Sequence, residues 1–169
     1  MKTFQELVEF VAKTTTPTDE KAQQVIANIR EQIKTYVETN KLKSLVIGAS
    51  GGLDSAVVAA LCQSKYTGVP LIGLSIPISS SNAHKEQAAW VGNTYCDAFE
   101  EFTGWDDSNL FPILEGSDSV AERAGFTVDA TTKSVLQGNM KARLRMITLY
   151  DMARKTNGLV LSTDNLSEF

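Results

Sequence analysis

Hydrophobic residues occur along this chain in two patterns, short uninterrupted runs and longer stripes with helical spacing. The uninterrupted runs predict buried strands at residues 45–47, 71–76 and 159–162. A more polar run at residues 98–103 contains Glu100 and Glu101 and predicts a partly exposed or edge strand. Four strands are therefore expected.

Stripes with helical spacing separate the runs. They predict helices over residues 3–11, 18–40, 54–66, 83–96 and 139–157. We expect Thr18 to cap the second helix and Asn40 to close it. Its apolar stripe consists of Val25, Ile26, Ile29, Ile33 and Val37.

The last helix is expected to start at a capping Asn139 and to have Gly158 just beyond its end. Its predicted buried face carries Met140, Leu144, Ile147 and Met152. Residues 105–125 contain Pro112 and Gly116, and these breakers predict short helices or a mobile loop.

The alternation of strands and helices predicts an α/β fold with a doubly wound parallel sheet, Rossmann-like and in three layers. Ligands of such sheets bind at the carboxyl ends of the strands. We expect three polar loops to meet there, at residues 48–55, 79–82 and 162–168. Without an internal linker, residues 1–169 form one domain.

Composition narrows the function classes. The net charge of −4 argues against nucleic-acid binding through a basic face. No apolar run reaches the roughly 18 residues of a membrane span, and the N-terminus is too acidic for a secretory signal. Cys62 and Cys96 lack metal-ligand spacing and are expected to be reduced, buried thiols. A cytoplasmic protein without nucleic-acid or membrane partners follows.

The stretch SLVIGASGGLDS, residues 44–55, reads as a buried strand, a glycine-rich turn and a helix start. Glycines allow close approach of backbone to an anion, and a helix N-terminus offers unpaired N–H groups to it. The turn matches neither the dinucleotide fingerprint nor the P-loop. The candidate phosphate-binding residues are Gly48, Ala49, Ser50, Gly51, Gly52, Leu53, Asp54 and Ser55.

Asp54 would repel a polyphosphate unless a cation lay between them. A magnesium ion that bridges carboxylate and phosphate removes this conflict. The alternative is a purely structural turn whose helix is capped by Asp54.

The segment SGGLDS resembles the pyrophosphate-binding loop of the N-type ATP pyrophosphatases, which have an adenine-nucleotide alpha-hydrolase-like fold. Two further segments are similar to those of one branch, the ammonia-dependent NAD synthetases. They are GNMKARLRM at residues 138–146 and LSTDNLSE at residues 161–168, in which Ser162 stands where glycine is commoner. The resemblance covers essentially the whole chain.

This resemblance implies that the glycine turn and Thr163 bind ATP and that Asp54 and Glu168 bind magnesium. It also implies that Arg143 contacts deamido-NAD at the interface of a homodimer, with the helix around Arg143 as interface element. The residues alone favour a solvated basic face for Lys141, Arg143 and Arg145, although Arg143 borders the apolar face.

The implied reaction is ATP-dependent amidation of deamido-NAD with ammonia. The nicotinate carboxylate attacks the α-phosphorus of ATP, pyrophosphate leaves, and ammonia displaces AMP from the NAD-adenylate. No residue is singled out as an acid, base or nucleophile, because positioning and charge neutralisation suffice. Ammonia is favoured over glutamine as the donor because the chain starts at the synthetase helices.

Members of the resembled family continue beyond the point that corresponds to Phe169, so we expect a domain that is incomplete at its C-terminal end and poorly active alone. The alternatives are another N-type ATP pyrophosphatase, such as a tRNA-modifying enzyme, and an inactive nucleotide-binding fragment. The single histidine, His84, is expected at the surface, and Trp90 and Trp105 in the core or an interface.

Overall fold

A computed structural model gives the structure of residues 18–163, without the side chains of residues 107 and 109–111. Its elements follow in the order α2 (Asp19–Thr39), β1 (Ser44–Gly48), α3 (Leu53–Leu61), α4 (Ser64–Thr67), β2 (Leu71–Ser75), α5 (Asn82–Tyr95), β3 (Ala98–Glu101), α6 (Asp107–Arg123), α7 (Ala130–Lys155) and β4 (Gly158–Leu161). The predicted helix at residues 3–11 lies outside the described residues.

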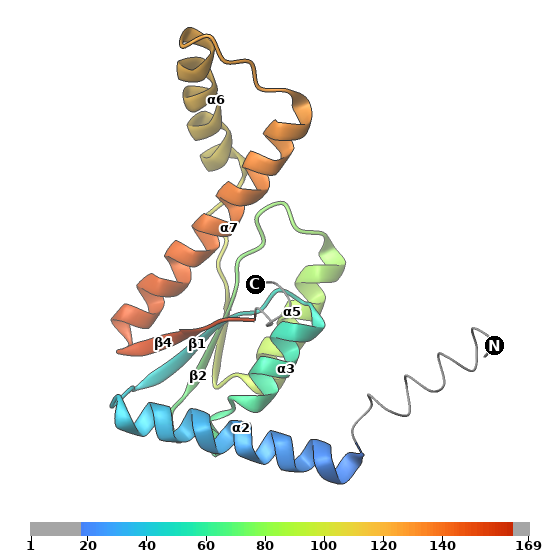
Figure 1. Cartoon of the computed structure of the whole chain (residues 1–169), viewed down its shortest axis with the longest axis vertical. Helices are drawn as coiled ribbons and strands as arrows, with labels where there is room; N and C mark the ends of the chain where they lie inside the picture. The colour runs from blue at the N-terminus through green and yellow to red at the C-terminus, as the bar shows by residue number, and fades with distance from the viewer. Residues whose placement is uncertain (1–17, 164–169) are drawn as a thin grey trace, which may run out of the picture.

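The four strands form one parallel sheet in the order β3-β2-β1-β4. Helices α3 and α5 cover one face of this sheet and α7 covers the other, with α2 beside the first pair (Figure 1). The α/β class, the doubly wound parallel sheet and the edge position of the polar strand β3 are therefore confirmed.

The uninterrupted apolar run of β1 is explained by the position of this strand in the middle of the sheet. Leu45 and Ile47 belong to the cluster under α3 and α5, whereas Val46 belongs to the cluster under α7. Successive side chains of a strand point to opposite faces, so a strand covered on both faces is apolar at every position.

Helix α2 follows its predicted pattern closely. The Thr18 side chain accepts a hydrogen bond from the backbone N–H of Lys21, and Asn40 closes the helix. Val37 is buried and Ile33 packs beside it, but Val25 of the predicted stripe is 48% exposed.

The prediction of one helix over residues 54–66 was wrong. Helix α3 ends at Leu61, Gln63 takes an extended conformation, and the short helix α4 follows. Gly68 then ends α4 with a left-handed φ of 79°, a conformation that glycine adopts without steric cost.

The prediction for the start of the last helix was also wrong. Helix α7 starts nine residues before Asn139, where the Asp129 carboxylate accepts a bond of 2.7 Å from the N–H of Thr132. This bond lowers the pKa of Asp129. The apolar residues of the added turns, Val135 and Leu136, are exposed, so no buried stripe marks them.

The other end and the face of α7 need smaller corrections. Asn157 takes the left-handed conformation (φ 49°) beyond the helix, and Gly158 instead starts β4. Met140, Leu144 and Met152 pack in the core as predicted, but Ile147 is 59% exposed.

Residues 107–123 form a single helix, α6, rather than short helices or a loop. Pro112 lies inside the helix, and the chain turns at Gly125 with φ 87°. Helices α6 and α7 together form a hairpin that projects beyond the sheet (Figure 1).

Candidate functional site

The glycine turn connects β1 to α3 at the carboxyl end of the sheet. Its start is fixed by a hydrogen bond of 2.8 Å from the N–H of Ala49 to the carbonyl of Leu74 on β2. Gly51 has a φ of 80°, and a Cβ there would lie 2.6 Å from the backbone oxygen of His84. The turn therefore requires glycine at this position, because its backbone packs directly on the first turn of α5.

Helix α3 starts without a side-chain cap. Gly52 is its N-cap residue, and no side chain of the described part of the chain caps its first turn. The alternative in which Asp54 caps the helix was wrong. The N–H groups of the first turn thus remain available at the turn, where the helix dipole also favours an anion.

The two serines of the turn have different surroundings. Ser55 is buried, and its hydroxyl donates to the Gly52 carbonyl at 2.9 Å. Ser50 is exposed, lies 3.1 Å from the Ser55 hydroxyl and accepts from the Gly52 N–H. Ser55 stabilises the turn, and Ser50 presents its hydroxyl to the surface.

Asp54 and Leu53 lie at the outer side of the turn. Both side chains are exposed, Leu53 by 77%. Within residues 18–163 no three acidic, histidine or cysteine side chains are grouped closely enough to hold a metal ion. Asp54 is the carboxylate of the turn. Glu168, the second predicted magnesium ligand, lies outside the described residues.

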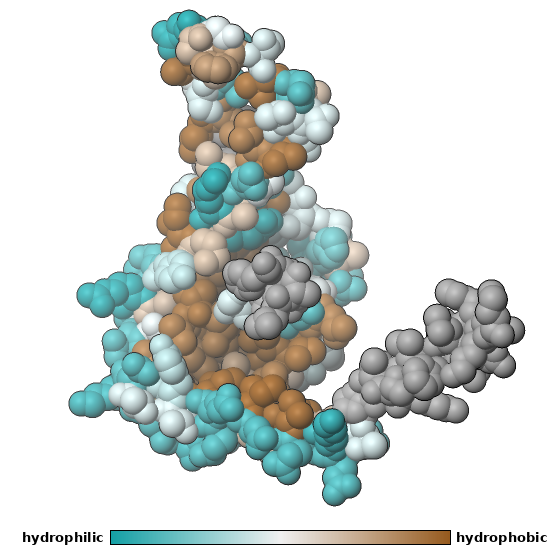
Figure 2. Space-filling view, in the orientation of Figure 1, coloured by the Kyte–Doolittle hydropathy of each residue, from teal (hydrophilic) through white to brown (hydrophobic). Residues whose placement is uncertain are grey.

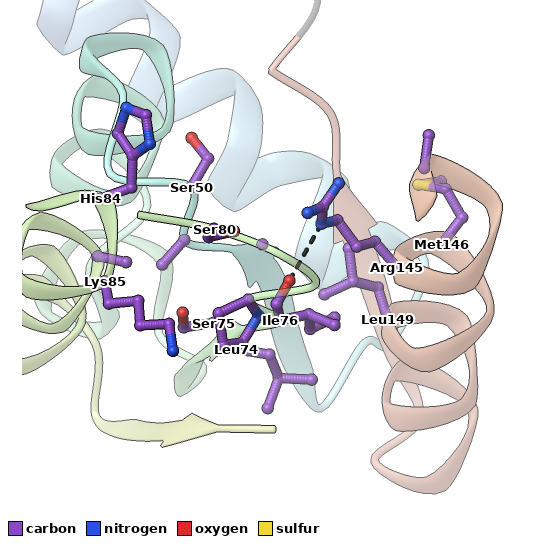
Figure 3. A pocket seen from close by; sticks show the side chains of 15 residues that line it. Ser50, Leu74, Ser75, Ile76, Ser80, His84, Lys85, Arg145, Met146 and Leu149 are labelled. Atoms are coloured by element: carbon purple, nitrogen blue, oxygen red, sulfur yellow. Dashed lines mark hydrogen bonds between the residues drawn. The ribbon is translucent and has the colours of Figure 1, made fainter. Parts of the chain in front are cut away.

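A cavity of about 420 Å³ opens beside the turn, between α5 and α7 (Figure 3). This volume lies in the range of small-molecule sites. The lining is mostly apolar and consists of Gly48, Ala49, Ser50, Leu74, Ser75, Ile76, Pro77, Ser80, His84, Lys85, Ala88, Ala142, Arg145, Met146 and Leu149. Two of the three loops predicted to meet at this edge, at residues 48–55 and 79–82, therefore do so. In the third, residues 162–163 do not line the cavity and residues 164–168 lie outside the described residues.

The charged groups that line the cavity are both cations. Lys85 is half-buried on α5, and Arg145 reaches in from α7 (Figure 3). Among residues 18–163, no carboxylate lines the cavity, although the chain as a whole is acidic. The cavity thus has a positive charge suited to an anionic ligand.

Arg145 is held by backbone rather than by an acid. Its Nε donates to the carbonyl of Ile76 at 3.1 Å and its Nη2 to the carbonyl of Ile78 at 3.4 Å. Burial lowers the pKa of its guanidinium, which nevertheless remains charged.

His84 is exposed, as predicted, but it also lines the cavity at the start of α5. Its Nδ1 lies 3.1 Å from the hydroxyl of Ser81, the residue that caps this helix. Trp105 packs against the core and donates to Thr148, whereas Trp90 is 59% exposed and is not a core residue.

The structure does not bring every candidate residue to the cavity. Arg143 is exposed and does not line it, whereas Arg145, two residues later on α7, is partly buried and does. Thr163 follows β4, whose Leu161 pairs with Ile47 of β1, and it is half-buried outside the cavity lining.

Sequence reasoning missed Arg145 and Lys85 as cavity residues. Arg145 lies one helical turn before Leu149, which is buried, so it shares a face with a core residue. That spacing was the available signal. Lys85 follows His84 in the first turns of α5 and had no comparable signal.

Both cysteines are free thiols, Cys62 buried and Cys96 half-buried. Burial raises the pKa of each to about 11. Among residues 18–163, no helix is long and apolar enough to cross a membrane.

The fold and the turn define a doubly wound α/β protein with an anion-binding turn beside a cationic cavity. The family model described as NAD synthase matches residues 25–169. The chain belongs to this family.

Relatives and solved structures agree with this assignment. The NH(3)-dependent NAD(+) synthetase of Finegoldia magna is 35% identical over 142 residues, which are 84% of this chain and 53% of that protein. That of Wolinella succinogenes is 38% identical over 126 residues, 75% of this chain and 44% of that protein. The chain spans about half the length of the curated relatives it matches.

Two solved structures are similar in fold. The NH3-dependent NAD synthetase of Campylobacter jejuni, in complex with the nitrate ion, has a TM-score of 0.67 and 28% identity, covering 86% of this chain and 58% of that chain. The NMN synthetase of Francisella tularensis has a TM-score of 0.66 and 27% identity, covering 86% and 56%.

Proposed function

We propose that the cavity and the glycine turn together bind ATP. The apolar lining, which includes Leu74, Ile76 and Leu149, suits a nucleobase, and the adjacent turn suits phosphates. The single observation that carries this proposal is that the turn and the cavity are continuous, since Gly48, Ala49 and Ser50 belong to the turn and also line the cavity.

Magnesium fits this arrangement. Mg²⁺ is usually held in nucleotide sites by one or two carboxylates, with phosphate oxygens and water as the other ligands. Asp54 supplies one exposed carboxylate at the turn, and we propose Glu168 as the second. When bound, the ion would neutralise phosphate charge as pyrophosphate leaves.

We further propose that the chain carries the nucleotide-binding part of an enzyme that amidates deamido-NAD with ammonia to give NAD. The nicotinate carboxylate attacks the α-phosphorus, and the bond from this phosphorus to the bridging oxygen breaks as pyrophosphate leaves. Ammonia then attacks the acyl carbon of the NAD-adenylate, and AMP leaves with the bonding electrons. Family membership and the similar NH(3)-dependent relatives support this reaction, which we place in the cytoplasm.

The residues of the chain contribute mainly by holding charge. Lys85 and Arg145 give the cavity its positive charge, and the turn offers backbone N–H groups to the departing pyrophosphate. Ser50 adds an exposed hydroxyl. We propose that Thr163, just beyond β4, adds a contact to ATP.

The test is a single-turnover assay in which the protein is in excess over ATP, and magnesium and ammonia are present at saturating concentration. Formation of AMP and NAD with deamido-NAD would support the proposal. AMP formation only with xanthosine monophosphate would indicate another ATP pyrophosphatase. ATP binding without AMP formation from any acceptor would indicate a nucleotide-binding protein without this chemistry.

A second acceptor is favoured by one observation, the similarity to the NMN synthetase of Francisella tularensis. By analogy, nicotinate mononucleotide would replace deamido-NAD in the same reaction. The assay should therefore include both acceptors at equal concentration. A preference for the mononucleotide would replace deamido-NAD as the substrate of the proposal.

We also propose that the chain forms a homodimer through the α6–α7 hairpin and that Arg143 contacts deamido-NAD there. Large apolar side chains are exposed along the hairpin, namely Ile113, Val120, Phe126, Val135, Leu136, Met146, Ile147 and Tyr150. Figure 2 shows hydrophobic surface on α7 as well as in the middle of this face, between α7 and α2. An exposed apolar surface of this kind is typical of an interface.

Light scattering coupled to size-exclusion chromatography tests the dimer. We expect twice the chain mass, and we expect Ile147→Glu to give the monomer because Ile147 is 59% exposed on this surface. A monomeric wild-type chain at high concentration would contradict the proposed dimer.

A further inference from the structure

Residues 76–80, which we call the cavity wall, lie between β2 and α5 and form one side of the cavity. Their conformation is unusually tight. The N–H of Ile78 donates to the carbonyl of Ile76 at 3.0 Å, a bond that spans only two residues. Ser79 has a φ of 53°, in the left-handed region that residues other than glycine rarely adopt. Such a segment needs support from its surroundings.

Helix α7 supplies this support through two cations one turn apart. Arg145 donates to the carbonyls of Ile76 and Ile78, and Lys141 Nζ donates to the hydroxyl of Ser79 at 2.9 Å. Together they bond to three of the four residues at positions 76–79, the part of the wall that contains the tight turn. Hydrogen bonds from charged donors are stronger than those from neutral ones.

The surroundings of Arg145 show that its contacts are not incidental. Its side chain is partly buried, and no carboxylate within residues 18–163 forms an ion pair with it. Charged side chains are rarely buried without a partner. The partners of Arg145 are two backbone carbonyls of the wall, which lie 69 and 67 residues before it in the sequence.

We propose that Lys141 and Arg145 are positioning residues that fix the cavity wall in the conformation that accepts the nucleotide. This inference rests on the proposed function only for the identity of the ligand. Ile76, Pro77 and Ser80 line the cavity, so release of the wall changes the shape of the cavity. Arg145 lines the cavity as well but Lys141 does not, so loss of the Lys141 side chain releases the wall without removing a group of the cavity lining.

The test combines two measurements on the same variants of the chain. Hydrogen exchange followed by mass spectrometry measures the opening of the backbone at residues 78–81, and calorimetry measures the affinity for MgATP. The variants are Arg145→Gln, Arg145→Lys and Lys141→Ala. Arg154→Ala is the matched control, because Arg154 is an exposed arginine on the same helix.

We expect Arg145→Gln to speed exchange of the wall and to weaken MgATP binding, each by about tenfold. Arg145→Lys should change the exchange rate and the MgATP affinity less than Arg145→Gln does, because lysine keeps a charged donor. Lys141→Ala should change both by a smaller factor, and Arg154→Ala should change neither. Circular dichroism identifies a variant that does not fold, and Lys141→Ala then decides the proposal.

Two outcomes would overturn the proposal. If MgATP affinity falls while exchange of the wall stays at the wild-type rate, Arg145 contacts the nucleotide directly. If neither quantity changes, the cations do not hold the wall. Failure of the wild-type chain to bind MgATP would instead refute the proposed function, and the exchange rates alone would then decide whether the two cations fix the wall.

Discussion

The glycine turn and the cavity wall line the same cavity, but they hold their shapes by different means. The side chains and glycines that shape the turn lie within it, with Gly51 at a positive φ and Ser55 bonded to Gly52, and its contacts to β2 and α5 are made by backbone. The wall is held by Lys141 and Arg145, more than 60 residues away. A sequence motif can identify the first kind of structure, whereas the second depends on which face of a distant helix is buried.

The largest effect is expected in the turn, from Gly51→Ala. A Cβ there would lie 2.6 Å from the oxygen of His84, and alanine would be strained at φ 80°. Strain of about 1–3 kcal/mol, added to this clash, should weaken MgATP binding on the order of 100-fold. Calorimetric titration with MgATP measures the effect.

Gly52→Ala is the matched control for that substitution. Its Cβ would meet only the Ser50 hydroxyl, at 3.3 Å, and φ is −86°. We expect a change of a few-fold at most. Equal losses for both variants would mean that the positive φ of Gly51 is not what shapes the turn.

Asp54→Asn should have the next largest effect, and it should depend on magnesium. We expect the affinity for ATP with magnesium to fall by about tenfold, and the affinity without magnesium to rise or stay constant because a negative charge is lost. Asp19→Asn, at an exposed first-turn aspartate of α2, is the control. A loss that is the same with and without magnesium would remove the metal role of Asp54.

The wall is probed by two substitutions of Ser79. Both Ser79→Ala and Ser79→Gly remove the hydroxyl that accepts from Lys141, but only glycine adopts φ 53° without strain. Chemical denaturation should find the glycine variant more stable than the alanine variant by about 1 kcal/mol. Equal stabilities would show that the left-handed conformation of Ser79 carries no cost.

The smallest effect concerns pH and involves Cys62, the residue that caps the end of α3. Burial raises the pKa of the Cys62 thiol from 9.0 to about 11, so between pH 9 and pH 11 the folded chain keeps the thiol proton and the unfolded chain loses it. The contribution of the buried, protonated thiol to the free energy of unfolding is complete below pH 9 and is lost as the pH rises toward 11.

At pH 10 the lost stability should be about 1 kcal/mol. Denaturation of wild type and Cys62→Ala at pH 7 and pH 10 measures it, because the difference between the two proteins cancels the other groups that titrate. An identical pH dependence of both proteins would contradict the buried thiol.

Prediction from the sequence succeeded where local chemistry decides. The strand around Val46, the cap at Thr18 and the glycine turn each follow from adjacent residues, and all three agree with the structure. The α/β class and the family assignment follow from the same local signals.

Prediction failed where tertiary contacts decide. The added turns of α7 carry exposed apolar residues, so their helical conformation has no buried stripe. Helix α6 contains Pro112, which reads as a break although the helix continues through it. Arg143 and Arg145 differ by two positions, which in a helix place them on different faces, and only the packing of Leu149 shows which one enters the cavity.

The central claim, that ATP binds in the cavity beside the glycine turn, is tested most directly by photo-crosslinking with 8-azido-ATP and mapping of the labelled peptides by mass spectrometry. We predict saturable labelling within residues 74–88 or 140–149, which ATP prevents, and its loss in Gly51→Ala. Labelling that ATP does not prevent, or that falls on other parts of the chain such as α2, would contradict the account.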